Sequence, residues 1–110
     1  MLVARFLPLL ALIAALVPGV ATAYHLLGPG GASCVTWTAD RRTNVNLYQI
    51  DQAWVLGFLS GVGYMGNANL DPLQGLNFRA VTTWIDNYCQ RYPLQGIEAA
   101  AKAFLTAHPR

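Results

Sequence analysis

The chain has 110 residues, of which 55% are hydrophobic and only 11% charged. This length suffices for one small domain. The formal net charge of +2 comes without any run of basic residues interleaved with aromatic ones, which argues against binding to nucleic acid or to a charged membrane surface.

The first segment has the pattern of a secretory signal peptide. Arg5 precedes an almost wholly apolar run over 7–17, and a Pro-Gly pair and the small residues of Ala21-Thr22-Ala23 follow it. Because a membrane-spanning helix needs about 20 apolar residues, a cleaved leader fits this shorter run better than an anchor. We therefore predict a signal peptide over 1–23, a periplasmic or secreted mature protein, and no membrane association after cleavage.

Cleavage would leave 87 residues with six basic and five acidic side chains, since Arg5 is lost with the leader. Glycines and a proline predict a flexible N-terminal arm over 24–32, followed by a helical domain over 33–110. Cys34 and Cys89, the two cysteines of the chain, are expected to form a disulfide in an oxidising compartment. A reactive thiol or a metal ligand is the alternative. With only two histidines in the chain, however, we predict no metal site and no cofactor.

Apolar residues at helical spacing predict an all-α fold, a small bundle of about four helices. Ser33 is the expected N-cap of a first helix that runs to about Asp40, and Asn77 is the expected N-cap of the third. Pro93 should end the third helix and can begin the fourth. In the third helix the residues expected to face inward are Phe78, Val81, Ile85, Tyr88 and Cys89.

The second helix, expected over 47–65, is unusually rich in glycine. Its core stripe is predicted to consist of Leu47, Ile50, Trp54, Phe58, Gly61 and Met65. Each glycine costs up to about 1 kcal/mol relative to alanine in a helix interior. Gly57, Ser60 and Gly61 should therefore let another backbone approach closely, more often within the chain than across a homodimer.

No motif of catalysis stands out in the sequence. Ser60 lies inside a helical pattern without a nucleophile elbow, and Asp51 is not part of a recognisable carboxylate pair. We assign no catalytic residue and expect no enzyme, with a small hydrolase as a remote alternative.

Three segments carry a resemblance to known proteins: Ser33-Cys34-x-x-Trp37, the run WVLGFLSG over 54–61, and WIDNYC over 84–89 followed by Pro93. Together they resemble the HdeA/HdeB acid-stress chaperones and the Tai-type immunity proteins of proteobacteria. The resemblance implies a periplasmic all-helical protein, often dimeric and without enzymatic activity, in which a disulfide joins the first and third helices.

The expected partner is thus another protein, either a client of a chaperone or an effector enzyme that an immunity protein blocks. Exposed aromatic residues and the loop over 66–76 would form the contact surface. The candidate contact residues are Trp84, Tyr64, Tyr48 and Asp71.

Overall fold

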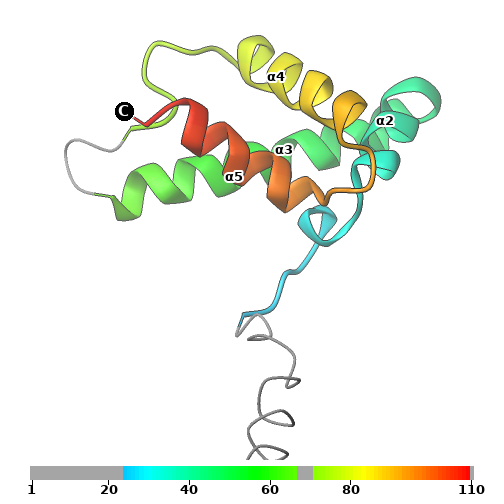
Figure 1. The fold of residues 1–110 in the computed structure, drawn as a ribbon, viewed down its shortest axis with the longest axis horizontal. Coiled ribbons are helices and arrows are strands. Elements are labelled where there is room, and N and C mark those ends of the chain that lie inside the picture. The colour runs from blue at the N-terminus through cyan, green and yellow to red at the C-terminus, as the bar shows by residue number, and fades with distance from the viewer. Residues whose placement is uncertain (1–23, 67–70, 110) are drawn as a thin grey trace, which may run out of the picture.

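The structure, a computed structural model, describes residues 24–66 and 71–109. They form a short 3-10 turn and four α-helices: η2 (Pro29–Gly31), α2 (Cys34–Thr43), α3 (Val45–Met65), α4 (Phe78–Arg91) and α5 (Ile97–Ala107). In Figure 1, α5 crosses in front of α3, α4 lies above both, and α2 closes one end. The all-α bundle of four helices is confirmed, whereas the predicted signal peptide over 1–23 lies outside the described residues.

The helix ends follow the predicted caps in part. The side chain of Asn77 accepts a hydrogen bond from the backbone N–H of Ala80 at the start of α4, as expected, and Asn44 does the same for Leu47 in α3. Ser33 occupies the N-cap position of α2, but its side chain makes no capping hydrogen bond. The amide of Cys34 instead donates to the carbonyl of Gln95, at 2.7 Å.

The sequence suggested that the fourth helix can begin at Pro93, but it begins later. This hydrogen-bonding arrangement explains the difference. The carbonyls of Pro93 and Gln95 accept hydrogen bonds from the first amides of α2, so the 92–96 connection stays a turn and α5 begins only at Ile97. The connection from α4 to α5 thereby satisfies the free N–H groups of α2.

The core lies where the four helices meet. Its fully buried side chains come from every helix: Trp37 from α2, Val55 and Leu59 from α3, Ile85 from α4, and Ile97 and Phe104 from α5. Among the described residues, none of the helices combines the length and the apolarity that a bilayer crossing requires.

The predicted core stripe of α3 is correct for Trp54 and Phe58, which are partly buried and pack against the core, and wrong for the other positions. Leu47, Ile50 and Met65 are exposed, Met65 to 81%, while the buried positions of this helix are Asp51, Gln52, Val55 and Leu59. The helix is thus rotated so that two polar side chains enter the interior. Asp51 contacts Asp40 of α2 there, and Gln52 contacts Tyr48 of α3 itself. Much of the apolar stripe remains at the surface.

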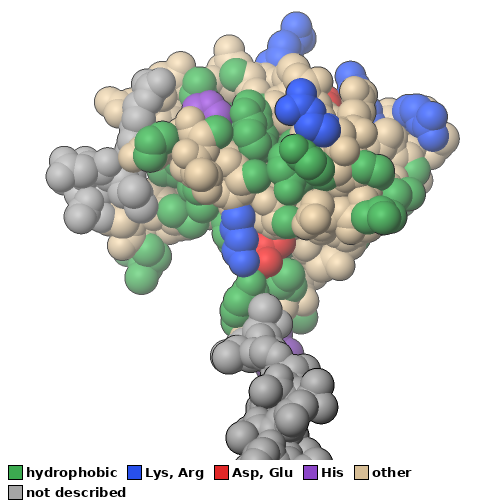
Figure 2. All heavy atoms as spheres, in the orientation of Figure 1, with side chains coloured by type: hydrophobic (Ala, Val, Ile, Leu, Met, Phe, Trp, Pro, Cys, Tyr) green, Lys and Arg blue, Asp and Glu red, His purple; other side chains and the backbone are tan. Residues whose placement is uncertain are grey.

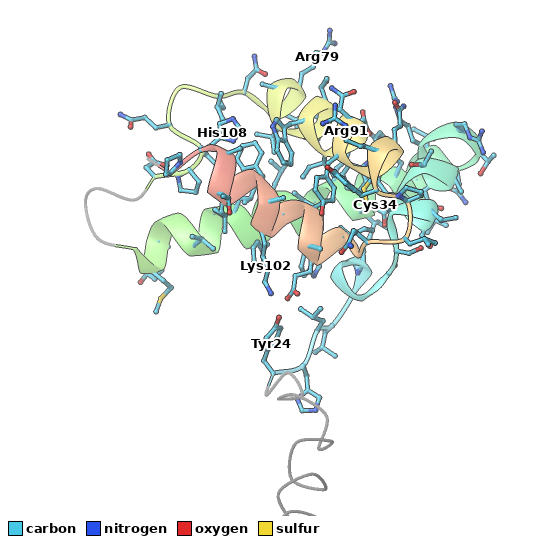
Figure 3. The ribbon with its side chains drawn as sticks, in the orientation of Figure 1. Tyr24, Cys34, Arg79, Arg91, Lys102 and His108 are labelled. Carbon is cyan, nitrogen blue, oxygen red and sulfur yellow. A yellow bond between two sulfur atoms is a disulfide. The ribbon has the colours of Figure 1, made fainter. Side chains whose placement is uncertain are left out.

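The predicted N-terminal arm makes specific contacts with two helices. Gly30 is buried against the indole ring of Trp54, and the Trp54 Nε1–H donates to the carbonyl of Leu27 at 2.9 Å. At the start of the arm, the Tyr24 hydroxyl lies between Lys102 and Glu98 of α5, and Figure 3 shows Lys102 directed toward Tyr24. These contacts cover one part of the apolar stripe of α3.

Gly30→Ala is expected to lower the free energy of unfolding by about 1–2 kcal/mol, because the added methyl group would overlap the Trp54 ring. Gly57→Ala serves as the matched control. A methyl group there meets no described atom within 4 Å, so this change should stabilise the helix by roughly 0.5–1 kcal/mol. Urea unfolding of both variants tests the packing of the arm; equal effects of the same sign would contradict it.

Candidate interaction surfaces

Cys34 and Cys89 form a disulfide whose Cα atoms are 4.8 Å apart. The predicted pairing is confirmed. It joins the first residue of α2 to the last turn of α4, and both cysteines are fully buried. Together with the hydrogen bonds from the 92–96 turn, the bridge fixes α2 against the end of α4.

Asp86 connects three helices inside the bundle. One of its carboxylate oxygens accepts hydrogen bonds from the Trp37 indole at 2.7 Å and from the Tyr48 hydroxyl at 2.9 Å. The other lies 3.4 Å from the Arg41 guanidinium. Burial and the nearby carboxylate raise the pKa of Tyr48 to about 12, so this hydroxyl remains a donor. Both oxygens of the buried Asp86 carboxylate therefore have partners, which a buried charge needs if it is not to destabilise the folded state.

A second carboxyl group, that of Asp51, is buried with poorer compensation. Its side chain is only 4% exposed, and its Oδ2 atom has no hydrogen-bond partner among the described residues. Burial and a hydrogen bond shared with Asp40 raise its pKa from 3.8 to about 7. Since two carboxyl groups can share a hydrogen bond only if one is protonated, this pair holds a proton at acidic to neutral pH.

The predicted contact residues do not form one site. Tyr64 is 87% exposed at the end of α3, and Asp71 is exposed in the loop before α4, of which 67–70 lie outside the described residues. Trp84 is half-buried, with its ring against Phe104 and His108. Tyr48 is half-buried as well and bonds to Asp86, so it belongs to the internal network rather than to a free surface.

The glycines of α3 have no close neighbour among the described residues. Gly57, Ser60 and Gly61 are exposed, and a methyl group added at either glycine meets no described atom within 4 Å. The residues that the structure describes therefore provide no intramolecular helix crossing at this place. The glycines form part of a surface that we call the α3 apolar face, which consists of Leu47, Ile50, Gly57, Gly61, Tyr64 and Met65.

Two features of the structure were missed from the sequence. One is the hydrogen-bond network of Asp86. The sequence did contain a signal for it, because Asp86 lies at helical spacing from Thr82 and Cys89 and therefore on the buried side of α4. The other is a pair of hollows beside the end of α4, each lined by one arginine. The walls of the hollow with Arg42 come from two distant segments, 35–42 and 89–93, so no local pattern indicates it. The walls of the hollow with Arg91 all lie within 84–92, at helical spacing along α4.

The residues described by the structure contain no group of three or more histidine, cysteine, aspartate and glutamate side chains that could hold a metal ion. Comparisons with protein-family models, with curated proteins and with solved structures give no match to this chain.

Proposed function

We propose that this chain is a non-enzymatic, periplasmic protein-binding module, and that it binds its partner in the folded state through the α3 apolar face. The observation that carries the proposal is that this face is exposed without any rearrangement. Large apolar side chains exposed along one helix of a small folded protein are typical of an interaction site.

The absence of charge on α3 supports a protein partner. The only charged residue of this 21-residue helix is Asp51, which is buried, so the exposed face carries none. Ile50 of this face is 54% exposed, and the open glycines allow a second backbone to approach closely. Large apolar side chains beside a flat backbone surface suit a helix or strand of another protein, or a second copy of this chain.

The covalent chemistry supports an oxidising compartment for this protein. A structural disulfide such as Cys34–Cys89 forms and persists in oxidising compartments. This supports export, in agreement with the predicted leader. The periplasm is the compartment that the resemblance to HdeA/HdeB and Tai-type proteins adds to the proposal.

Among the two roles that the resemblance implies, the geometry favours the immunity or inhibitor role. An immunity-type protein binds as a folded module, and here the contact face is already exposed. Acid would also leave the Asp51 carboxyl neutral, which removes a destabilising buried charge instead of creating one. This group therefore opposes an opening of the fold at low pH.

The acid-stress chaperone role is the second candidate, and Asp86 is the observation that favours it. This one carboxylate accepts hydrogen bonds from Trp37 and Tyr48 and holds Arg41, so three helices depend on a single buried group. Loss of these contacts would separate the helices, which is the opening that a chaperone of this kind requires. The test is suppression of client aggregation at about pH 2 to 3, roughly one unit or more below the ordinary carboxylate pKa; no protection there ends the chaperone role.

The folded-state proposal is tested by complex formation at neutral pH. The oxidised chain is co-expressed with each tagged product of the genes that neighbour its own, and complexes are measured by size-exclusion chromatography with light scattering. We expect one stable complex, which Ile50→Asp weakens at least about tenfold because a charge enters an apolar contact. Gln49→Asp, also exposed but on another side of α3, should leave it unchanged.

Two results would contradict the proposal. One is that no gene product binds and the chain does not bind itself either. The other is a complex that tolerates Ile50→Asp as well as it tolerates Gln49→Asp.

A further inference from the structure

The exposed arginines of the structure lie in two helices that contact each other, α2 and α4, whereas Lys102 lies apart from them on α5. Arg41 and Arg42 lie in the last turn of α2, while Arg79 and Arg91 lie in the first and last turns of α4. Figure 2 shows basic side chains over α2 and α4 with almost no acidic side chain among them. In Figure 3, Arg79 projects from the outer side of α4 and Arg91 lies near its other end.

The small net charge of the chain conceals this basic surface. Asp51 and Asp86 are buried, and Glu98 is paired with Lys102 at 3.1 Å. Arg41 is held by Asp86. For Arg42, Arg79 and Arg91, no described carboxylate lies within the 4.0 Å of an ion pair, so their charges are available to a partner.

Two hollows flank the end of α4, and each combines apolar walls with one arginine. The Arg91 hollow has a volume of about 200 Å³ and is lined by Trp84, Asn87, Tyr88, Arg91 and Tyr92. The Arg42 hollow has about 290 Å³ and lies between α2 and the end of α4, with Val35, Cys89 and Pro93 in its wall. Both are smaller than the roughly 300–1,000 Å³ of most small-molecule sites, and each suits a single side chain of a partner.

The aromatic side chains of the Arg91 hollow support one another. The rings of Trp84 and Tyr88 are stacked with centroids 5.8 Å apart. The ring of Tyr92 packs against that of Tyr88, with centroids 4.9 Å apart. Between the two hollows runs a ridge over 90–94, at whose end Leu94 is 90% exposed. Because the disulfide and the turn to α5 fix this ridge, binding would require little ordering.

We propose that this surface, the two hollows with the ridge between them, binds an acidic segment of a partner protein. Carboxylates of the segment pair with Arg42 and Arg91, and its apolar side chains enter the hollows. Tyrosine, tryptophan and arginine around small pockets are the composition of protein-binding hot spots. Phosphate backbones instead require a continuous basic track, whereas here each arginine stands beside apolar walls.

The proposal goes beyond the α3 apolar face, since it concerns different helices and a different chemistry. It is tested with the full oxidised chain and a synthetic peptide rich in glutamate and phenylalanine, followed by ¹H–¹⁵N NMR. We expect chemical-shift changes over 35–42 and 87–94. Arg42→Glu and Arg91→Glu should each weaken binding about tenfold, because a favourable charge pair becomes a repulsive one.

Arg79→Glu is the matched control, with the same change of charge outside both hollows; it should change the affinity by less than about threefold. Ile50→Asp should have no effect on peptide binding, which separates this surface from the α3 apolar face. The proposal is overturned if the peptide does not bind or Arg79→Glu weakens it as much as Arg91→Glu. Tighter binding of duplex DNA, of anionic phospholipid vesicles or of the same peptide with lysine in place of glutamate would also overturn it.

Discussion

Replacing both Cys34 and Cys89 with alanine is expected to lower the free energy of unfolding by about 4 kcal/mol. The disulfide closes a loop with a sequence separation of 55 residues, and removing such a constraint increases the entropy of the unfolded chain by this amount on the chain-entropy model. For a domain of this size, that is a large share of the total stability. Urea unfolding of the oxidised protein and of the double variant measures the difference.

Reduction of the wild-type protein provides the control, since the chain contains no other cysteine. The reduced protein and the double variant should unfold at similar urea concentrations, both well below the oxidised protein. A difference of less than about 1 kcal/mol between oxidised and reduced protein would show that the helices hold together without the bridge.

Asp51→Asn is expected to stabilise the protein at pH 8 but not at pH 4. The folded-state pKa of Asp51, about 7, lies above its ordinary value of 3.8. Between these values the folded protein holds a proton that the unfolded chain releases, so the contribution of Asp51 to stability is complete below pH 4 and is lost as the pH rises through 7. Asparagine keeps a donor for Asp40 and does not ionise.

The gain in unfolding free energy from Asp51→Asn should therefore be roughly 4 kcal/mol larger at pH 8 than at pH 4. Denaturant titrations of both proteins at the two pH values give this difference directly, because other titrating groups cancel between them. Gln49→Asn, at an exposed side chain of the same helix that does not ionise, should show no such pH dependence. A gain from Asp51→Asn that is equal at both pH values would mean that the buried carboxyl does not titrate as described.

Local signals in the sequence were sufficient for much of the fold. The spacing of apolar residues predicted four helices, Asn77 was recognised as a cap, and the presence of only two cysteines left one possible disulfide. These features depend on short stretches of chain or on a single choice of partner. The start of α5 could not be predicted in this way, because it depends on the carbonyls of 93–95 bonding to the distant α2.

The orientation of α3 could not be predicted, because apolar residues surround most of this helix. A pattern that is hydrophobic on several sides does not specify which side is buried. Contacts from other parts of the chain decide this: Asp40 from α2 for Asp51, and the arm around Gly30 for Trp54. The apolar side of α3 that these contacts leave uncovered is the α3 apolar face, on which the proposed function depends.

Net charge likewise failed to indicate the basic surface. Counting residues gives acidic and basic side chains equal weight, whereas the fold buries Asp51 and Asp86 and leaves Arg42, Arg79 and Arg91 outside. Only the burial of individual carboxylates, which depends on tertiary packing, converts a nearly neutral chain into one with a basic side.

Photo-crosslinking in the producing cells at neutral pH tests the central claim most directly, that the folded protein binds another protein through the α3 apolar face. A photoreactive phenylalanine analogue replaces Ile50 in one variant and the neighbouring exposed Gln49 in another. We predict a discrete crosslinked protein adduct from position 50 and none, or far less, from position 49. Equal labelling from both positions, or no adduct from position 50, would contradict the account.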